Sequence, residues 1–583
     1  MYQESYKSFL DRSTAGQYAW RFIQKTLSEC LNAHEICKQK ARCIYVPTRL
    51  VELSGLDSGP QFRVVSHHQV EPNSQYLTLS YCWGKHSEQD QLMLTKSSLI
   101  TLSTFQSVSK LPQTIRDATT VVSQLGFRYL WVDRYCIIQD SLDDWMHEAP
   151  LMKEVYGNCF LNISASGAED SETGLFFQRD PSWVPVTLVN VSIAAPNNVK
   201  PYIFEIEKAI FSSDTCFHDE PLSQRGWAVQ ERILAPRVLH FGRYLIYWEC
   251  WTTVYLEPVP NVVDYSVVHA ERKFRRETDK TWKTLLSGIS IDGLANPCNQ
   301  TVEPGDRVPY LFQEWYNIRD LYAQCDLTYP SDKLAAISGL ARDMKRRLME
   351  FGCKDTTYLA GIWKCRLPRD LLWYSIRSGH IPSRRANPYR SPSWSWAAID
   401  GPHIMTHKVG CWGPFEVLAS VINAETISEN PDDDTGRVTH GIIRINGDLF
   451  SADVGMLNSE VDEEDDIDPV TSRILTIGHG SETRIRVCEL FTKDGEEKCL
   501  GSWIMFDTAD DFRNSVLCLP IFANFFDQDY NRLLHGLVLV IGLALVEDRL
   551  GRFRRVGIFQ LGMGKERFQK DFNKAERRCI SIL

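Results

Sequence analysis

Hydrophobic side chains recur at spacings that predict alternating strands and helices over residues 76–242. The apolar run 76–81 predicts a strand that leads to Gly84, where the backbone is free for close approach by a ligand. Apolar residues at three- and four-residue spacing predict a helix over 111–126, and 129–133 predicts a second buried strand. Strand, helix and strand in this order are typical of a parallel sheet, whose ligands usually bind at the carboxyl ends of the strands.

A further helix is expected after the strand at 129–133. It contains Trp145 and Glu148, and Pro150 predicts a kink or a restart directly after Ala149. The next apolar runs predict further strands at 160–165, 238–241 and 244–248.

The first 45 residues predict a packed helix. One face carries apolar side chains at helical spacing together with three potential metal ligands: Trp20, Ile23, Leu27, Cys30, Leu31, His34 and Cys37.

The carboxyl-terminal half has weaker patterns. Residues 315–346 predict a helix around the start at 331–333, and 392–396 predicts an aromatic strand or turn. Residues 410–561 favour strands, and the run 459–468, with seven acidic side chains in ten positions, predicts a solvated loop. We therefore divide the chain into an N-terminal helical and extended segment, an α/β domain, a largely helical region and a strand-rich region, at 1–72, 73–242, 243–410 and 411–583.

Composition narrows the class of protein. The 583 residues are 43% hydrophobic and 24% charged, which is typical of a folded globular chain. A formal net charge of -10 disfavours binding to nucleic acid or to anionic membranes. Residues 1–12 lack the apolar core of a secretory signal, and no apolar run is long enough for a membrane span. Seventeen cysteines scattered through apolar stretches favour a reducing, cytoplasmic location.

Four motifs carry a resemblance to a known family. In chain order they are Leu79-Ser80-Tyr81-Cys82-Trp83-Gly84, the run from Leu130 to Asp140, Trp145-Met146-His147-Glu148-Ala149, and Arg225-Gly226-Trp227 followed by Gln230-Glu231-Arg232. Together they resemble the fungal heterokaryon-incompatibility (HET) domain. Flanking segments that resemble full-length members are Cys30, His34 and Cys37 followed by 47–50 before the domain, and 332–334, 338–341 and 392–397 after it.

The resemblance implies a role in fungal self/non-self recognition, in which HET domains trigger cell death through a protein partner or self-assembly. It also implies a TIR-like fold, with a central, mostly parallel sheet flanked by helices, here followed by a larger α+β region. Some TIR domains cleave NAD+ with one glutamate. NAD+ is therefore a candidate substrate, and no cofactor is expected.

Cleavage of NAD+ passes through an oxocarbenium-like ribose, which needs a nearby carboxylate, an aromatic surface and phosphate-binding groups. Glu148 is the predicted catalytic carboxylate, and Asp133 is expected to orient a ribose hydroxyl. Trp83 is predicted to stack on a base, with Gly84 beside the pyrophosphate and Arg225 paired with phosphate. The other predicted substrate-binding residues are Tyr81, Cys136, Gln139, Trp227, Gln230 and Glu231.

Each assignment has a structural alternative. Glu148 also fits a solvated neighbour of the packed Trp145, and Asp133 also fits a helix or turn cap. Trp83 and Trp227 also fit the core, and Arg225 with Glu231 also fits a buried ion pair. No GxGxxG or P-loop pattern is present, so the sequence favours neither a dinucleotide dehydrogenase nor a nucleoside triphosphatase.

Cysteine chemistry offers two weaker hypotheses. Cys136 with His86 or His147 as base is a candidate nucleophile, although its apolar neighbours favour a packing role. Cys30, His34, Cys37 and Cys43 have metal-ligand residue types but lack the paired CxxC signature of zinc sites, so an apolar helix seam is the preferred interpretation and no metal is predicted.

Two other function classes stay open. One is a non-catalytic signalling module that acts through partner assembly. The other is an enzyme recruited to fungal secondary metabolism that uses acid-base chemistry on a small molecule. Three residues favour this last interpretation, because they alter the rim of the site. Arg134 and Tyr135 stand where the family often has smaller or aliphatic residues, and the third is Pro150.

Overall fold

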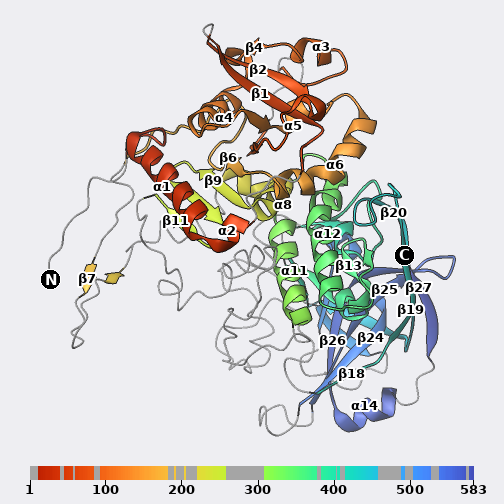
Figure 1. Ribbon diagram of the computed structural model, residues 1–583. Helices are drawn as coiled ribbons and strands as arrows, with labels where there is room; N and C mark the ends of the chain where they lie inside the picture. The colour runs from red at the N-terminus through yellow and green to blue at the C-terminus, as the bar shows by residue number, and fades with distance from the viewer. Residues whose placement is uncertain are drawn as a thin grey trace. The chain divides into compact units, whose positions relative to one another are not determined.

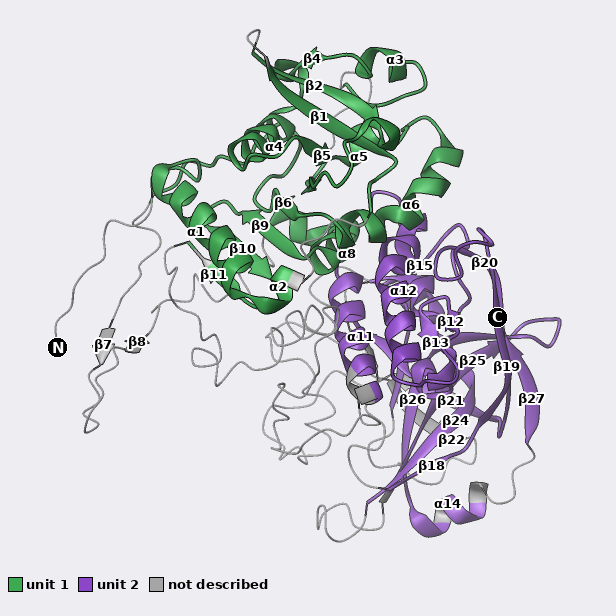
Figure 2. Ribbon diagram, viewed as in Figure 1, with its two compact units in different colours: residues 1–307, 325–327 green, residues 308–324, 328–583 purple. Residues whose placement is uncertain are grey.

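The computed structural model describes residues 11–39, 45–56, 59–84, 92–180, 189–191, 202–204, 220–257, 307–376, 383–401, 403–406, 414–456, 488–492, 503–526, 537–572 and 577–583. These form two compact units: residues 1–307 with 325–327, and residues 308–324 with 328–583 (Figure 2).

The first unit is built on a nine-stranded sheet in the order β11-β10-β9-β6-β3-β5-β1-β2-β4 (Figure 1). Its four central strands are β3 (Tyr76–Ser80), β5 (Tyr129–Trp131), β6 (Leu161–Ser164) and β9 (Arg237–Phe241), and they are parallel to one another. All four consist entirely of buried residues, as expected for strands covered on both faces. The predicted α/β class is confirmed.

The outer strands are antiparallel to their neighbours. On one side the sheet continues through β1 (Arg49–Leu56), β2 (Gly59–Ser66) and β4 (Gln106–Ser107). On the other side it ends with β10 (Ile246–Cys250) and β11 (Val254–Leu256). The parallel part of the sheet is therefore limited to its centre.

The order of the parallel strands creates a topological switch point. The chain runs from β3 through α4 (Gln113–Gln124) to β5 on one side, and then through α5 (Asp133–Cys136) and α6 (Leu142–Gly157) to β6 on the other side of β3. The connections that leave the neighbouring strands β3 and β6 thus run in opposite directions, toward β5 and toward β9, and such a reversal opens a crevice in doubly wound folds, where ligands usually bind. A ligand site is therefore expected at the carboxyl ends of β3, β5 and β6.

Helix α6 runs from Leu142 to Gly157 without a break at Pro150. The predicted restart after Ala149 is therefore wrong. Proline removes one hydrogen bond, to the carbonyl of Met146, but Ala149, Met152 and Val155 are buried around it and hold the helix by packing.

At the start of the chain, the predicted helix is present as two pieces, α1 (Gln17–Ala33) and α2 (Glu35–Gln39). His34 separates them in an extended conformation. Helix α1 contacts β10.

The second unit has two long helices, α11 (Arg307–Ala323) and α12 (Ala335–Glu350). The helical region predicted over 315–346 is therefore present, but it is interrupted: α11 ends at Ala323 and α12 begins at Ala335, just after the predicted start at 331–333. Tyr329 is extended before Pro330, because the residue before a proline avoids the helical region, and a short 3-10 turn follows at Pro330–Lys333. The turn alternative for 392–396 is confirmed, since a bend there leads into a 3-10 turn at Trp396–Ala398.

A ten-stranded, almost wholly antiparallel sheet completes the second unit and confirms the predicted strands over 410–561. Its core contains buried Val, Ile, Leu, Phe and Ala side chains. The strands are β18 (Phe415–Val417), β19 (Ser420–Ser428), β20 (Val438–Gly447), β21 (Phe450–Met456), β22 (Cys488–Thr492), β23 (Trp503–Phe506), β24 (Ser515–Phe525), β25 (Leu537–Glu547), β26 (Phe553–Gly564) and β27 (Arg578–Ile582).

The acidic run predicted as a loop at 459–468 lies outside the described residues. Among the helices that the structure describes, none combines the length and the apolar character needed to cross a bilayer.

Candidate functional site

The loops after β3 and β5 bring Trp83 and Asp133 together at the carboxyl edge. The indole Nε1 of Trp83 donates a hydrogen bond of 2.8 Å to Oδ2 of Asp133. The guanidinium of Arg134 lies 4.5 Å from the centre of the Trp83 ring. Gly84 follows with φ +86°, a left-handed conformation that turns the chain away from the strand.

Asp133 is the first residue of α5, and its side chain is half-buried. Its Oδ1 accepts a hydrogen bond of 2.7 Å from the backbone nitrogen of Arg134, a local contact with the next residue; the N-cap residue of α5 is Val132, so Asp133 does not cap this helix. Gln139 donates from Nε2 to the carbonyls of Asp133 and Ile137, each at 3.0 Å. This contact fixes the loop, and the Asp133 carboxylate is held in place from both sides.

Arg225 and Glu231 approach the same edge from the start of α8 (Gly226–Leu234). Arg225 donates through Nη1 to the carbonyl of Tyr81, at the end of β3. Burial raises the pKa of Glu231 to about 7, although the positive charge of Arg225 and hydrogen bonds from Ser80 and Tyr156 lower it. Burial by itself lowers the pKa of Arg225, but the charge of Glu231 reverses this and the pKa is raised.

Glu148 lies in a neighbouring group of charges. Arg49, the first residue of β1, pairs with Asp144 at 2.5 Å and places Nη1 3.6 Å from Oε1 of Glu148. The Glu148 side chain is 2% exposed, and burial raises its pKa against the effects of Thr48 and Arg49. Among the described residues, Oε1 of Glu148 has no hydrogen-bond partner.

The residues around Asp133 and the charges around Glu148 lie on one sheet edge. This is because β1 is antiparallel to β5, which puts Arg49 beside the carboxyl end of β5. Arg49 also donates a hydrogen bond of 2.8 Å to the carbonyl of Cys136. The structure thus brings Glu148 and Asp133 to the same edge, and the negative charges of both act on the nearby thiol of Cys136.

Comparison with known families identifies the segment that supplies most of this edge. Residues 76–231 match the family model "Heterokaryon incompatibility protein (HET)". This chain carries a HET domain. The match covers β3, β5, β6 and α8 up to Glu231, while Arg49 lies before it. No curated protein and no solved structure matches the chain, and a likeness of the HET domain to TIR domains stays a prediction.

The other predicted substrate-binding residues are distributed around the edge. Tyr81 is buried, and among the described residues its hydroxyl has no hydrogen-bond partner. Trp227 is half-buried at the start of α8, and Gln230 is buried on the same helix. Gly84 is exposed.

The surroundings of Cys136 disfavour a role as a nucleophile. Its side chain is fully buried, and burial raises the pKa of the thiol to about 12, with the nearby negative charges adding to the effect. The thiolate is the nucleophile, so a raised pKa works against that role. His147 is exposed, and His86 lies outside the described residues.

The first unit also contains a buried chain of hydrogen bonds that was not predicted from the sequence. Ser166 Oγ lies 3.1 Å from Nδ1 of His240, whose Nε2 lies 3.2 Å from Glu249, and Arg232 donates to Glu249 at 2.8 Å. Ser166, His240 and Glu249 are all buried. Its four members lie on four separate segments, so no local spacing could have revealed the set.

The raised pKa of Glu231 leads to a prediction about stability. Between pH 4.5, the ordinary pKa, and about 7, the folded state holds a proton that the unfolded state releases. Stability should therefore fall as pH rises across this window, by a total of about 3 kcal/mol. Glu231→Gln imitates the protonated side chain, so we expect it to exceed the wild type in stability by an increasing margin up to pH 7.

Denaturant unfolding of both proteins at several pH values measures this margin. Asp143→Asn, at an exposed position in the first turn of α6, serves as the control. A difference between wild type and Glu231→Gln that stays constant between pH 4.5 and 7.5 would show that Glu231 ionises normally.

Proposed function

We propose that this HET-domain protein acts in fungal self/non-self recognition, and that it triggers cell death by hydrolysing NAD+ at the carboxyl edge of its sheet. In this reaction the bond between the ribose C1′ and the nicotinamide nitrogen breaks, and its electron pair leaves with nicotinamide. Water adds to C1′ and loses a proton. The products are nicotinamide, ADP-ribose and H+.

The observation that carries the proposal is the buried carboxylate of Glu148 at a switch-point edge. One of its oxygens has no hydrogen-bond donor among the described residues, and its pKa is raised by burial. Buried groups with perturbed pKa values that lack hydrogen bonds concentrate at functional sites. A carboxylate in this environment stabilises a positively charged ribose more strongly than one in water.

The remaining groups at the edge fit the parts of a dinucleotide. The half-buried Asp133 is suited to accept hydrogen bonds from ribose hydroxyls, as carboxylates are acceptors when ionised. Arg225 is suited to pair with phosphate. Trp83 is half-buried, with Arg134 4.5 Å from the centre of its ring, and its indole is suited to stack on a base.

Glu148 is nearly inaccessible in this structure, so the proposal includes an opening step. The contact that must change is the one between Arg49 and Glu148, at 3.6 Å, while the closer Arg49–Asp144 pair, at 2.5 Å, keeps Arg49 charged and paired. Such a step suits a protein that stays inactive until it is triggered.

Induced expression of the full chain in a fungal host tests the proposal, with NAD+ content and viability followed together. We expect NAD+ to fall before viability is lost, and Glu148→Gln to prevent both effects. Glu154→Gln, a half-buried position further along α6, is the matched control and should behave as wild type. Equal killing by wild type and Glu148→Gln at constant NAD+ would overturn the proposal in favour of signalling by assembly.

A further inference from the structure

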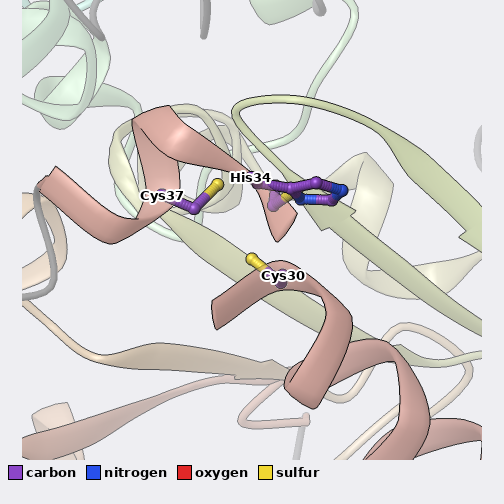
Figure 3. Close-up of side chains that lie close together, drawn as sticks. Cys30, His34 and Cys37 are labelled. Atoms are coloured by element: carbon purple, nitrogen blue, oxygen red, sulfur yellow. The ribbon is translucent and has the colours of Figure 1, made fainter. Parts of the chain in front are cut away.

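Three cysteines and one histidine meet at the opposite edge of the sheet of the first unit. Cys30 comes from α1, His34 from the break between the helices, Cys37 from α2 and Cys250 from the end of β10. One ligand atom from each lies within 4.8 Å of all the others, and all four residues are buried. Figure 3 shows Cys30, His34 and Cys37 with their side chains gathered in one place.

Cys250, the fourth member of this group, could not be predicted from spacing in the sequence. Cys250 is 216 residues from His34 and pairs across the sheet with Arg237, the first residue of β9. This places the group at the amino edge of the parallel strands, away from Glu148 and Asp133. Cys43, the fourth candidate in the sequence, lies outside the described residues.

The distances fit a tetrahedral metal site. With Zn–S of about 2.3 Å and Zn–N of about 2.0 Å, tetrahedral ligands are separated by about 3.5–3.8 Å. The Sγ of Cys250 lies 3.5 Å from Nδ1 of His34. The remaining separations, up to 4.8 Å, need only small side-chain rotations to reach these values.

The second nitrogen of His34 is already engaged. Its Nε2 lies 3.5 Å from the hydroxyl of Tyr255, which donates at 2.8 Å to a carboxylate oxygen of Glu29. Histidines that bind metals almost always hold the other ring nitrogen in such a contact, because it fixes the tautomer and the ring orientation. This arrangement leaves Nδ1 directed at the cysteines.

The charge around the group is also suited to a metal. Arg237 is buried and donates through Nε to Sγ of Cys30 at 3.4 Å, and through Nη2 to the carbonyl of Cys37 at 2.8 Å. Three thiolates with a divalent cation carry one net negative charge, which the guanidinium balances. A buried cation is costly without such a partner, so Arg237 fits a thiolate-metal centre better than four neutral side chains.

We propose that Cys30, His34, Cys37 and Cys250 bind one structural Zn2+ ion. Four protein ligands close the coordination sphere, as in structural sites, and leave no open position for catalysis. The ion would attach α1 and α2 to β10 and so fix the start of the chain on the edge of the sheet. Its folding contribution is independent of NAD+ hydrolysis at the other edge.

Metal analysis of the full chain, expressed with zinc in the medium and purified without chelators or a metal-affinity tag, tests the site. We expect about one zinc per chain, and loss of most of it in Cys250→Ser and in His34→Ala. Cys518→Ser, a buried cysteine in the second unit, is the matched control and should keep its zinc.

Cobalt loading keeps the proposal testable if those variants fail to fold. Wild-type protein stripped of metal and supplied with Co2+ should show the visible bands of a tetrahedral site and a thiolate-to-cobalt charge-transfer band. Absence of zinc together with absence of these bands would overturn the proposal. A count of 15 free thiols under denaturing, chelating conditions, two fewer than the 17 cysteines of the chain, would also overturn it, since it would indicate a disulfide within the group.

Discussion

Asp507→Ala should destabilise the second unit by about 3–5 kcal/mol, because it leaves a buried guanidinium without its counter-charge. Arg555 and Asp507 are 0% and 1% exposed and form two hydrogen bonds, at 2.9 and 3.1 Å. Arg555 also donates to the carbonyls of Leu371 and Trp373 and lies 3.5 Å from the centre of the Trp373 ring. Its charge therefore cannot move to solvent when Asp507 is removed.

Denaturant unfolding of the full chain, monitored by tryptophan fluorescence, measures this loss. Asp434→Ala is the matched control, because Asp434 pairs with Lys345 at the surface with 60% of its side chain exposed. Exposed pairs contribute about 0–1 kcal/mol. Equal, small effects of both substitutions would show that the Arg555–Asp507 pair is hydrated or replaceable.

Glu148→Gln should lower NAD+ turnover by about 10²–10³-fold, the range found when one group that stabilises charge developing in a transition state is removed. The substitution keeps the shape of the side chain and removes the charge that faces the developing ribosyl cation. Arg49 keeps Asp144 as its partner, at 2.5 Å, so the fold around α6 should persist. Rates of nicotinamide release at saturating NAD+ give the effect on kcat.

The pH profile separates a catalytic Glu148 from a merely structural one. Burial raises the pKa of Glu148, and the reaction uses the ionised form, so activity should increase as pH rises through that pKa. Asp133→Asn should mainly raise KM, because Asp133 is proposed to hold the ribose. A Glu148→Gln enzyme with normal turnover, beside a normal Glu154→Gln control, would remove Glu148 from the mechanism.

The sequence predicted the elements that local patterns determine. The buried strands β3, β5 and β6 were predicted from short apolar runs, and two of the motifs that resemble the family, 79–84 and 130–140, begin within β3 and β5. The restart predicted at Pro150 does not occur, because packing of Ala149 and Met152 outweighs the local effect of proline. A helix start near 331–333 was predicted, but the end of α11 at Ala323 was not, because the following residues 325–327 belong to the first unit, where Asp326 pairs with Arg225 and Gly226.

The parts of the site that depend on long-range contact could not be predicted. Arg49 was known only as part of a flanking motif, and its approach to Glu148 follows from the antiparallel pairing of β1 with β5. The raised pKa of Glu231 arises from burial of its carboxylate, which outweighs the lowering effect of hydrogen bonds from Ser80 and Tyr156 on other elements. Cys250 joins Cys30, His34 and Cys37 only through the register of β10 with β9.

Release of nicotinamide and ADP-ribose from NAD+ by the purified full chain is the most direct measurement of the proposed activity. It should be made at high protein concentration, where self-assembly is favoured, beside Glu148→Gln and Glu154→Gln. We predict equimolar release of both products by the wild type and Glu154→Gln, and loss of both with Glu148→Gln. Folded wild-type protein that leaves NAD+ intact at every concentration would contradict the proposed hydrolysis.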